Sequence, residues 1–347
     1  MAMRRAMMMP LALAAAPLAA AGPQPRELET YRDWITGCDN GSACATVSLV
    51  PEDAPAVDSP VTVTISRDGA VLAQPVIWIS GLERIKGPIS LVIDGKAVAT
   101  TTAITADDDA RFTGPRGVEI ARAIANGMTM EVHNGQKLLS RPSLRGAAAA
   151  LRYMDAQQGR AGTTTALVAI GTLRRTVTTP PPALPIIPRL LAPKTKPAAL
   201  MPGELARAVK ASGCGEEDRF RSPTDVFALS KGQALVLVPC GSGAYNSLHV
   251  PLIATGSTGS RSFAVAKFDL NPGWREDSGK PMLVNANFDV ARSTLSSYAK
   301  GRGVGDCGSS EAYVWNGRMF RLIEAWQMGE CRGAWRWITT WRATPKP

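Results

Sequence analysis

The chain has 347 residues, with 39 Lys and Arg against 29 Asp and Glu, and so a formal net charge of +10. This length exceeds what a single hydrophobic core comfortably supports, which favours two domains. Beyond the N-terminus no stretch is apolar over the about 20 residues that a bilayer span needs, which excludes a later transmembrane helix. The positive charge fits an anionic envelope polymer or an acidic partner, but equally a solvated surface. We expect no nucleic-acid partner.

Residues 1–21 have the pattern of a secretory signal peptide. Arg4 and Arg5 precede an apolar run over residues 7–18, and three alanines at 19–21 supply small residues at the cleavage position. The pattern predicts export to the periplasm, with a soluble mature protein that begins near Gly22.

Six cysteines are an even number in an oxidising compartment, which predicts three disulfide bonds and no free thiol. Proximity in sequence favours the pairs Cys38–Cys44, Cys214–Cys240 and Cys307–Cys331. In the chain-entropy model, closing a loop of about 27 residues stabilises the fold by ~3.5 kcal/mol. Loss of either long-loop bridge should therefore threaten folding of its domain.

Residues 22–177 predict an N-terminal β-rich domain, an antiparallel sheet or sandwich with short helices. Asp-Gly pairs at 68–69 and 94–95, typical of hairpin turns, separate its strands. Helices are expected over residues 117–125 and 144–156. The expected strands are residues 61–65, 76–79, 89–93, 97–100 and 128–132.

Residues 178–202 hold eight prolines and predict a semi-extended linker, or else a Pro-rich recognition segment. Residues 203–347 then predict a disulfide-linked, β-rich C-terminal domain that opens with a helix over 203–211. A two-residue hairpin is expected at Asn316-Gly317. The expected strands are residues 234–238, 248–253, 262–268, 282–288, 311–315, 318–326 and 335–341. The fold class is therefore mainly β (α+β), with two antiparallel β domains and a few short helices.

The sequence offers little for metal or cofactor chemistry. The two histidines, His133 and His249, lie far apart and no Cys-x-x-Cys occurs, which argues against zinc. The acidic run 107–109 lacks the glycine and distal glutamate of a calcium loop and is expected to be an exposed turn. No cofactor and no metal are predicted.

Nucleophilic catalysis has one weak candidate. Ser297 and Lys300 match Ser-x-x-Lys, yet no Lys-Thr-Gly follows, and no Gly-x-Ser-x-Gly elbow exists. We predict no catalytic residue. Five tryptophans after residue 314 fit either a hydrophobic core or a sugar-binding platform.

Two loops are the candidate partner-binding surface. The first carries Ser242, Gly243, Tyr245 and Asn246 just after Cys240, and the second carries Arg302 shortly before Cys307. A disulfide beside each loop would hold it rigid, and Tyr and Arg are enriched at binding hot spots. The run Ser-Gly-Ala-Tyr at 242–245 also resembles the short loop that periplasmic lysozyme inhibitors place in the lysozyme cleft.

Motifs along most of the mature chain resemble the six-cysteine exported bacterial proteins of domain of unknown function family 1176. They are WITGC at 34–38, the Tyr-Asn at 245–246 after Cys240, KGRGVGDCG at 300–308, WNG at 315–317 and ECRG at 330–333. This resemblance implies export and six cysteines, and it supplies no catalytic residue. The first domain also resembles the invasion-associated locus B family, through its tryptophan before a cysteine pair, β-rich middle and late helix.

The expected function is a non-enzymatic binding or envelope-associated module of the bacterial periplasm. Two alternatives stay open. One is a protein similar to lysozyme inhibitors that uses the 242–245 loop, and the other is an enzyme directed at the cell wall. The partner is unknown, with an envelope protein, lysozyme or an anionic envelope polymer as candidates.

Overall fold

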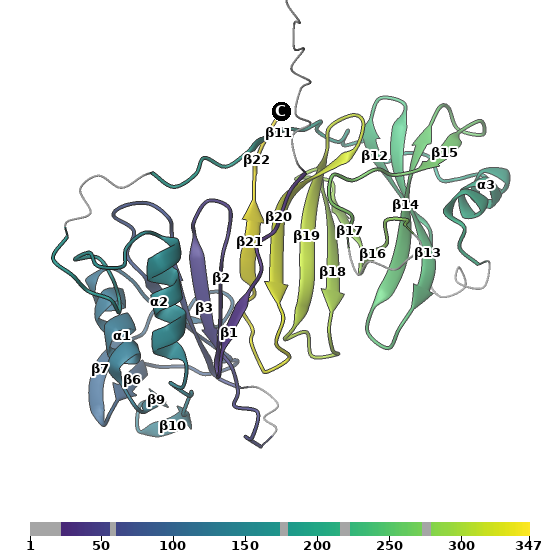
Figure 1. Cartoon of the computed structure of the whole chain (residues 1–347). Coiled ribbons are helices and arrows are strands. Elements are labelled where there is room, and N and C mark those ends of the chain that lie inside the picture. The colour runs from purple at the N-terminus through teal and green to yellow at the C-terminus, as the bar shows by residue number, and fades with distance from the viewer. Residues whose placement is uncertain (1–21, 56–59, 174–179, 216–222, 273–278) are drawn as a thin grey trace, which may run out of the picture.

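The computed structural model describes residues 22–55, 60–173, 180–215, 223–272 and 279–347. The expected signal peptide, residues 1–21, lies outside them. Across the described residues the protein is mainly β, with several antiparallel sheets and few helices, so the predicted fold class is confirmed (Figure 1). None of the helices in this part of the chain is long and apolar enough to cross a bilayer.

The N-terminal half contains two antiparallel sheets and two helices. One sheet has the order β1 (Glu29–Tyr31), β2 (Trp34–Cys38), β3 (Cys44–Ser48), β4 (Thr62–Arg67), β5 (Val76–Ser80) and β8 (Ala110–Phe112). The other has the order β10 (Lys137–Ser140), β9 (Met130–Asn134), β6 (Ile89–Ile93) and β7 (Lys96–Thr101). The helices are α1 (Pro115–Asn126) and α2 (Ala147–Gln157), and α2 packs on β2 and β3.

Side-chain alternation builds the core of this half. In β6, Ile89, Leu91 and Ile93 are buried while the residues between them are half-buried, as the two-residue period of a strand requires. Helix α2 buries Leu151 and Met154 against the same core. The sheets and helices therefore share one hydrophobic cluster.

The described residues of the C-terminal half form two larger sheets and a two-stranded one. Helix α3 (Pro202–Ser212) covers one, whose order is β12 (Asp225–Ser230), β13 (Gln233–Ser242), β14 (Ser247–Thr255) and β15 (Ser262–Val265), with β16 (Leu283–Val284) also paired to β14. The second sheet has the order β17 (Asn287–Asp289), β18 (Thr294–Lys300), β19 (Gly308–Trp315), β20 (Phe320–Met328) and β21 (Ile338–Arg342). Strand β13 serves two cores: Val236 and Val238 join the cluster under α3, while Leu235 and Leu237 join the cluster of the second sheet.

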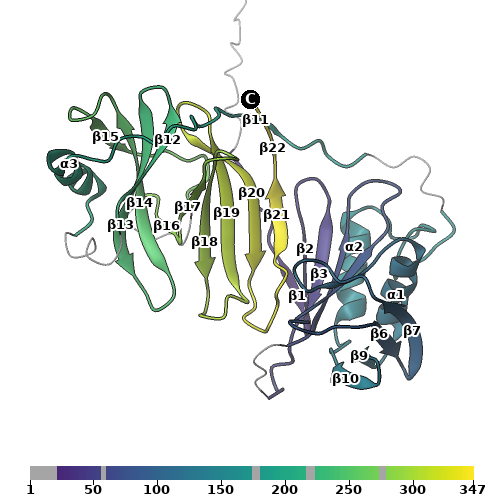
Figure 2. The ribbon, with the colours of Figure 1, turned by 180° about the vertical axis from the view of Figure 1, so that it is seen from behind.

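The two halves are in contact along β21, which lies beside β2 (Figure 2). A small hydrophobic cluster spans this junction, with Ile35 and Val47 from the N-terminal half against Met328 and Ile338. Four ion pairs cross it as well among the described residues. They join Arg332 to Asp33 at 2.6 Å and to Glu52 at 3.6 Å, Arg336 to Asp109 at 2.5 Å, and Arg342 to Asp39.

The proline-rich segment is hydrogen-bonded to the C-terminal half over part of its length. Strand β11 (Ile186–Pro188) pairs in parallel with β22 (Thr344–Lys346) near the chain terminus. The Leu190 N–H then donates to the carbonyl of Trp315 at 2.8 Å, and the Ala192 N–H donates to Ser293 Oγ at 2.8 Å. The predicted division into separately folding domains at residues 178–202 stays a prediction.

Two local expectations are wrong. The turn between β19 and β20 has four residues rather than two, because Trp315 pairs with Phe320 and the Asn316 side chain accepts the N–H groups of Arg318 and Met319. The strand expected over 282–288 is divided into β16 and β17. Asn285 interrupts it with a φ of 45°, in the left-handed region.

Candidate functional site

The three disulfides join Cys38 to Cys44, Cys214 to Cys240 and Cys307 to Cys331, the neighbour pairs expected from the sequence. The last two lie beside the candidate loops. Cys240 comes one residue before the loop 241–246, and Cys307 comes directly after the glycine-rich loop 301–306. We call these two loops together the loop pair.

The structure brings the two loops of the loop pair into direct contact. The Tyr245 hydroxyl donates to the carbonyl of Gly301 at 3.0 Å. The Asn246 amide donates to the carbonyl of Lys300 at 2.9 Å, and its oxygen accepts the Lys300 N–H at 3.2 Å. Asn285 adds a further bond to the Asn246 oxygen at 2.8 Å. Asn246 therefore joins its loop to the end of β18 and to Asn285.

Arg302 makes a two-pronged pair with a buried carboxylate of its own loop. Its Nε lies 2.7 Å from Asp306 Oδ1 and its Nη2 lies 2.5 Å from Oδ2, which also accepts the Gly333 N–H at 2.6 Å. Burial raises the pKa of Asp306, but the hydrogen bonds from Arg302 and Gly333 outweigh it and hold the pKa below its usual range. Much of the Arg302 charge is thus used to order the loop.

Exposed apolar surface lies on the loop pair. The Tyr245 side chain is 40% exposed and Val304 is 60% exposed. The ring of Tyr245 lies close to Gly303, since a Cβ placed there would be 3.6 Å from its Cδ1 atom. Ser242 and Gly243 are exposed as well. Among the predicted residues, Asn246 is half-buried and hydrogen-bonded, Arg302 is paired with Asp306 although its side chain is 50% exposed, and Ser242, Gly243 and Tyr245 are exposed.

A cavity of about 670 Å³ extends from the loop pair to the N-terminal half. Its walls are mostly apolar, and its volume lies in the range of small-ligand sites. Arg332 in this wall donates to the carbonyls of Val50 and Arg32 and to Asp33, so its charge is balanced. The lining residues outside the loop pair are Val50, Pro51, Glu52, Ala54, Pro55, Pro60, Cys331, Arg332, Gly333 and Trp335.

A family model described as Protein of unknown function (DUF1176) matches residues 28–344. The chain belongs to this family. The Uncharacterized protein YpfG of Escherichia coli (strain K12) is 27% identical over 335 residues, covering 90% of this chain and 91% of the relative. No solved structure matches the chain.

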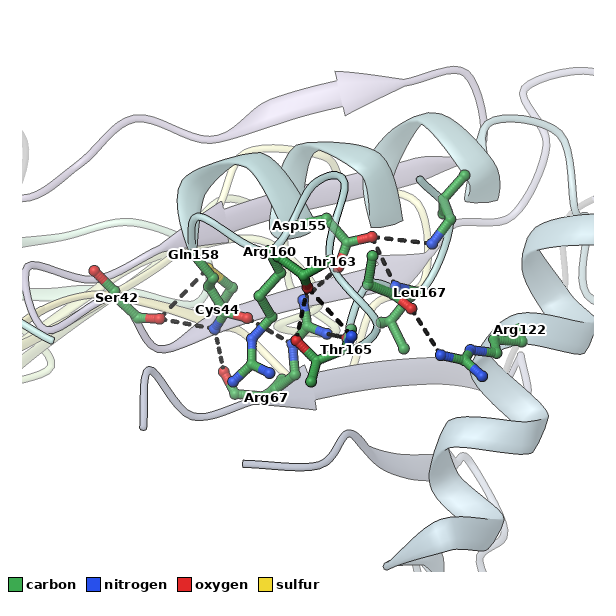
Figure 3. Close-up of polar contacts among 12 residues, drawn as sticks. Ser42, Cys44, Arg67, Arg122, Asp155, Gln158, Arg160, Thr163, Thr165 and Leu167 are labelled. Atoms are coloured by element: carbon green, nitrogen blue, oxygen red, sulfur yellow. Dashed lines mark hydrogen bonds and ion pairs between the residues drawn. The ribbon is translucent and has the colours of Figure 1, made fainter. Parts of the chain in front are cut away.

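This member of the DUF1176 family also contains a buried polar network that the sequence did not indicate (Figure 3). The Arg67 Nη2 atom lies 2.7 Å from Asp155 Oδ1, and both side chains are almost fully buried. Gln158 accepts a bond from Arg67 Nε, while Asp155 Oδ2 accepts the N–H groups of Leu167 and Val168. The network fastens the segment that follows α2 to strand β4, which is a structural role.

The structure brings neither the Ser-x-x-Lys motif nor the acidic run 107–109 into an arrangement suited to catalysis or metal binding. Ser297 and Lys300 lie three residues apart on β18, so their side chains leave opposite faces of the sheet. Ser297 is buried, and its oxygen accepts the Val284 N–H at 3.1 Å. Within the acidic run, Asp109 is bound to Arg336. No group of three or more metal-binding side chains occurs among the described residues.

None of the five late tryptophans is exposed: Trp315 is buried and the other four are half-buried. Trp315 is buried in the core of the second C-terminal sheet, and Trp341 packs against that core. Trp337 stacks on Tyr298 with ring centroids 5.0 Å apart, and the Trp335 indole N–H donates to the carbonyl of Pro60. Trp335 is the one among these that lines the cavity.

Proposed function

We propose that this protein is an exported, non-enzymatic binding module of the bacterial envelope that contacts a protein partner through the tip of the loop pair. The observation that carries the proposal is Tyr245, which is 40% exposed although its hydroxyl is bound to Gly301. An aromatic ring held in place and left in solvent is ready to bind without further ordering. The N-terminal signal pattern and the three disulfides support location in the periplasm.

Rigidity supports binding by this surface. A loop that is ordered before binding loses little conformational entropy when a partner arrives, and the disulfide at Cys307 and the Arg302–Asp306 pair both restrict the second loop. Exposed Val304 lies on this loop beside the mostly apolar cavity. Tyrosine beside apolar surface is typical of binding hot spots.

The pairing of the arginines at this surface favours a partner with an apolar group over an anionic polymer. Arg302 is paired with Asp306 and Arg332 with Asp33, so the two guanidinium groups beside the cavity have carboxylate partners already. A new anion would have to compete with them. The part of the loop pair that is open to contact is therefore Tyr245, Val304 and the small residues Ser242 and Gly243.

The test is binding of the Tyr245→Ala variant to immobilised lysozyme, and in parallel to proteins cross-linked to the chain in the periplasm. Hot-spot truncation costs about 2 kcal/mol or more, so we expect affinity to fall about thirtyfold with an unchanged melting temperature. Tyr245→Phe, which keeps the ring, should bind nearly normally. Leu72→Ala, at a residue 89% exposed elsewhere, is the control.

Arg302→Ala should behave differently, because it leaves the Asp306 carboxylate buried without its guanidinium. We expect a lower melting temperature rather than a selective loss of binding. If Tyr245→Ala unfolds the protein, or binds every captured protein as tightly as the parent does, the proposal is wrong.

A further inference from the structure

A second cavity, of about 600 Å³, lies where the proline-rich segment crosses the end of the sheet that α3 covers. Segment residues 193–198 form one wall. The opposite wall consists of the β12–β13 turn, with Lys231 and Gly232, and the β14–β15 connection, with Thr258 and Arg261. This volume lies within the range of small-ligand sites, and the location is separate from the loop pair.

Arg261 places a buried positive charge in this wall. Its side chain is 6% exposed, and Nη2 donates to the Ala198 carbonyl and to Thr258 Oγ1, both at 3.0 Å. Nη1 has no hydrogen-bond partner among the described residues. The nearest carboxylate oxygen, Glu204 Oε2, is 3.7 Å away, beyond hydrogen-bonding distance.

Glu204 is largely occupied by other donors. Its Oε1 accepts the N–H groups of Gly259 and Arg261, and its Oε2 accepts the Met201 N–H at 3.0 Å. These bonds hold the pKa of Glu204 below its usual range despite the opposing effect of burial. The carboxylate thus stays ionised and neutralises one cation, and Arg261 Nη1, itself a buried atom, makes no hydrogen bond among the described residues.

Further cations surround this cavity without carboxylate partners. Lys231 lies in its wall, and Lys194 and Lys196 alternate with lining residues Pro193, Thr195 and Pro197. All three lysines are exposed, and none has an ion-pair partner in the described part of the chain. One carboxylate therefore faces several cations, and the cavity has an excess of positive charge.

We propose that this cavity binds a phosphate-type oxyanion, either free or as part of a headgroup, with the Arg261 guanidinium and the Lys231 ammonium as its positive charges. A guanidinium and an ammonium in the lining of one small cavity supply the charge-assisted hydrogen bonds that an oxyanion requires. Thr195 lies in the opposite wall. A bound anion would therefore also fix the proline-rich segment against the sheet.

The experiment titrates the full mature protein with inorganic phosphate and follows binding by calorimetry. We expect saturable binding that becomes about tenfold weaker in Lys231→Glu, since a charge-assisted hydrogen bond contributes about 1.5 kcal/mol or more. Lys137→Glu makes the same charge change at an exposed residue of β10, far along the sequence, and should bind like the parent. Arg261→Lys, which keeps the charge, tests the buried donor.

Co-sedimentation with phosphatidylglycerol vesicles, against pure phosphatidylcholine vesicles, separates the two sources of the anion. Phosphate binding that Lys231→Glu weakens supports a free oxyanion. Binding to the anionic vesicles alone, lost in Lys231→Glu and kept in Lys137→Glu, supports a lipid headgroup. If neither probe binds, or if the two lysine variants behave alike, the proposal is overturned.

Discussion

At the scale of the residue, His249 is a buried base in an apolar setting. It lies in β14 opposite Pro239 of β13 and Leu283 of β16, and its side chain is 8% exposed. Its Nδ1 atom has no hydrogen-bond partner among the described residues. Burial lowers the pKa of His249, and the attraction of Asp225 offsets this effect only in part. The folded protein therefore holds this imidazole neutral.

The lowered pKa of His249 makes the stability of the folded protein depend on pH. In the unfolded chain a histidine titrates near its ordinary pKa of about 6.5, so below this pH the unfolded state binds a proton that the folded state does not. Stability should therefore fall as the pH drops from about 7 to about 5, and His249→Gln should reduce that fall. Melting curves across this range check it. His133→Gln, whose imidazole is paired with Glu131, is the control, and equal pH dependence in both variants would contradict the assignment.

At the scale of the element, the Arg67–Asp155 pair joins strand β4 to helix α2 and to the segment behind it. A buried pair of this kind adds little net stability compared with an apolar core. Removing one member is destabilising, because the other charge then lies buried without its partner. The geometry also fixes how the chain leaves α2. The main effect of the pair is therefore to position residues 160–168, the segment that follows α2, against strand β4.

We predict that Asp155→Ala lowers the free energy of unfolding by about 3 kcal/mol, because the buried guanidinium then lacks its carboxylate. Denaturant unfolding measures the change. The matched control is Glu119→Ala, which breaks the Arg116–Glu119 pair on the surface of α1, where both side chains are 55% exposed. That pair should contribute less than about 1 kcal/mol. Similar losses in the two variants would show that the network is not specially important.

The helices and strands differ in how clearly the sequence predicts them. The three helices lie within a few residues of their expected positions, because glycine ends α1 and α3 and apolar periodicity marks their inner faces. Strand β18 was missed because Ser297 and Ala299 occupy its buried face, so no apolar alternation appears. The buried polar network could not be predicted from the sequence for another reason. Arg67 and Asp155 are 88 positions apart, and only the fold brings them together.

At the scale of the whole molecule, the junction between the halves was equally hidden in the sequence, since Arg332 and Asp33 are 299 positions apart. The contact of the two loops of the loop pair was not predicted either, although their residues were named. Proximity to a cysteine indicated that each loop is ordered. It gave no information on which loops would meet.

Cutting the chain once in the proline-rich segment tests how strongly the halves hold together. A specific protease site inserted after Pro182 lies before the stretch that β11 begins, so the segment bonded to the C-terminal half stays with that half. We expect the two fragments to co-elute in gel filtration, because the apolar cluster and four ion pairs still join them. Adding Ile338→Asp, in the centre of that cluster, should release them. Separation of the fragments without this change would show that the junction is weak.

The parallel pairing of β11 with β22 has a consequence for the order of events during synthesis. Strand β22 comprises residues 344–346, so β11, at residues 186–188, has no partner until synthesis has passed residue 346. The N–H of Arg26, near the other end, likewise donates to the carbonyl of Thr340. A ribosome that stops before residue 340 would leave both segments without their partners. Truncated products would thus present unpaired strand edges, which proteases and quality-control chaperones recognise readily.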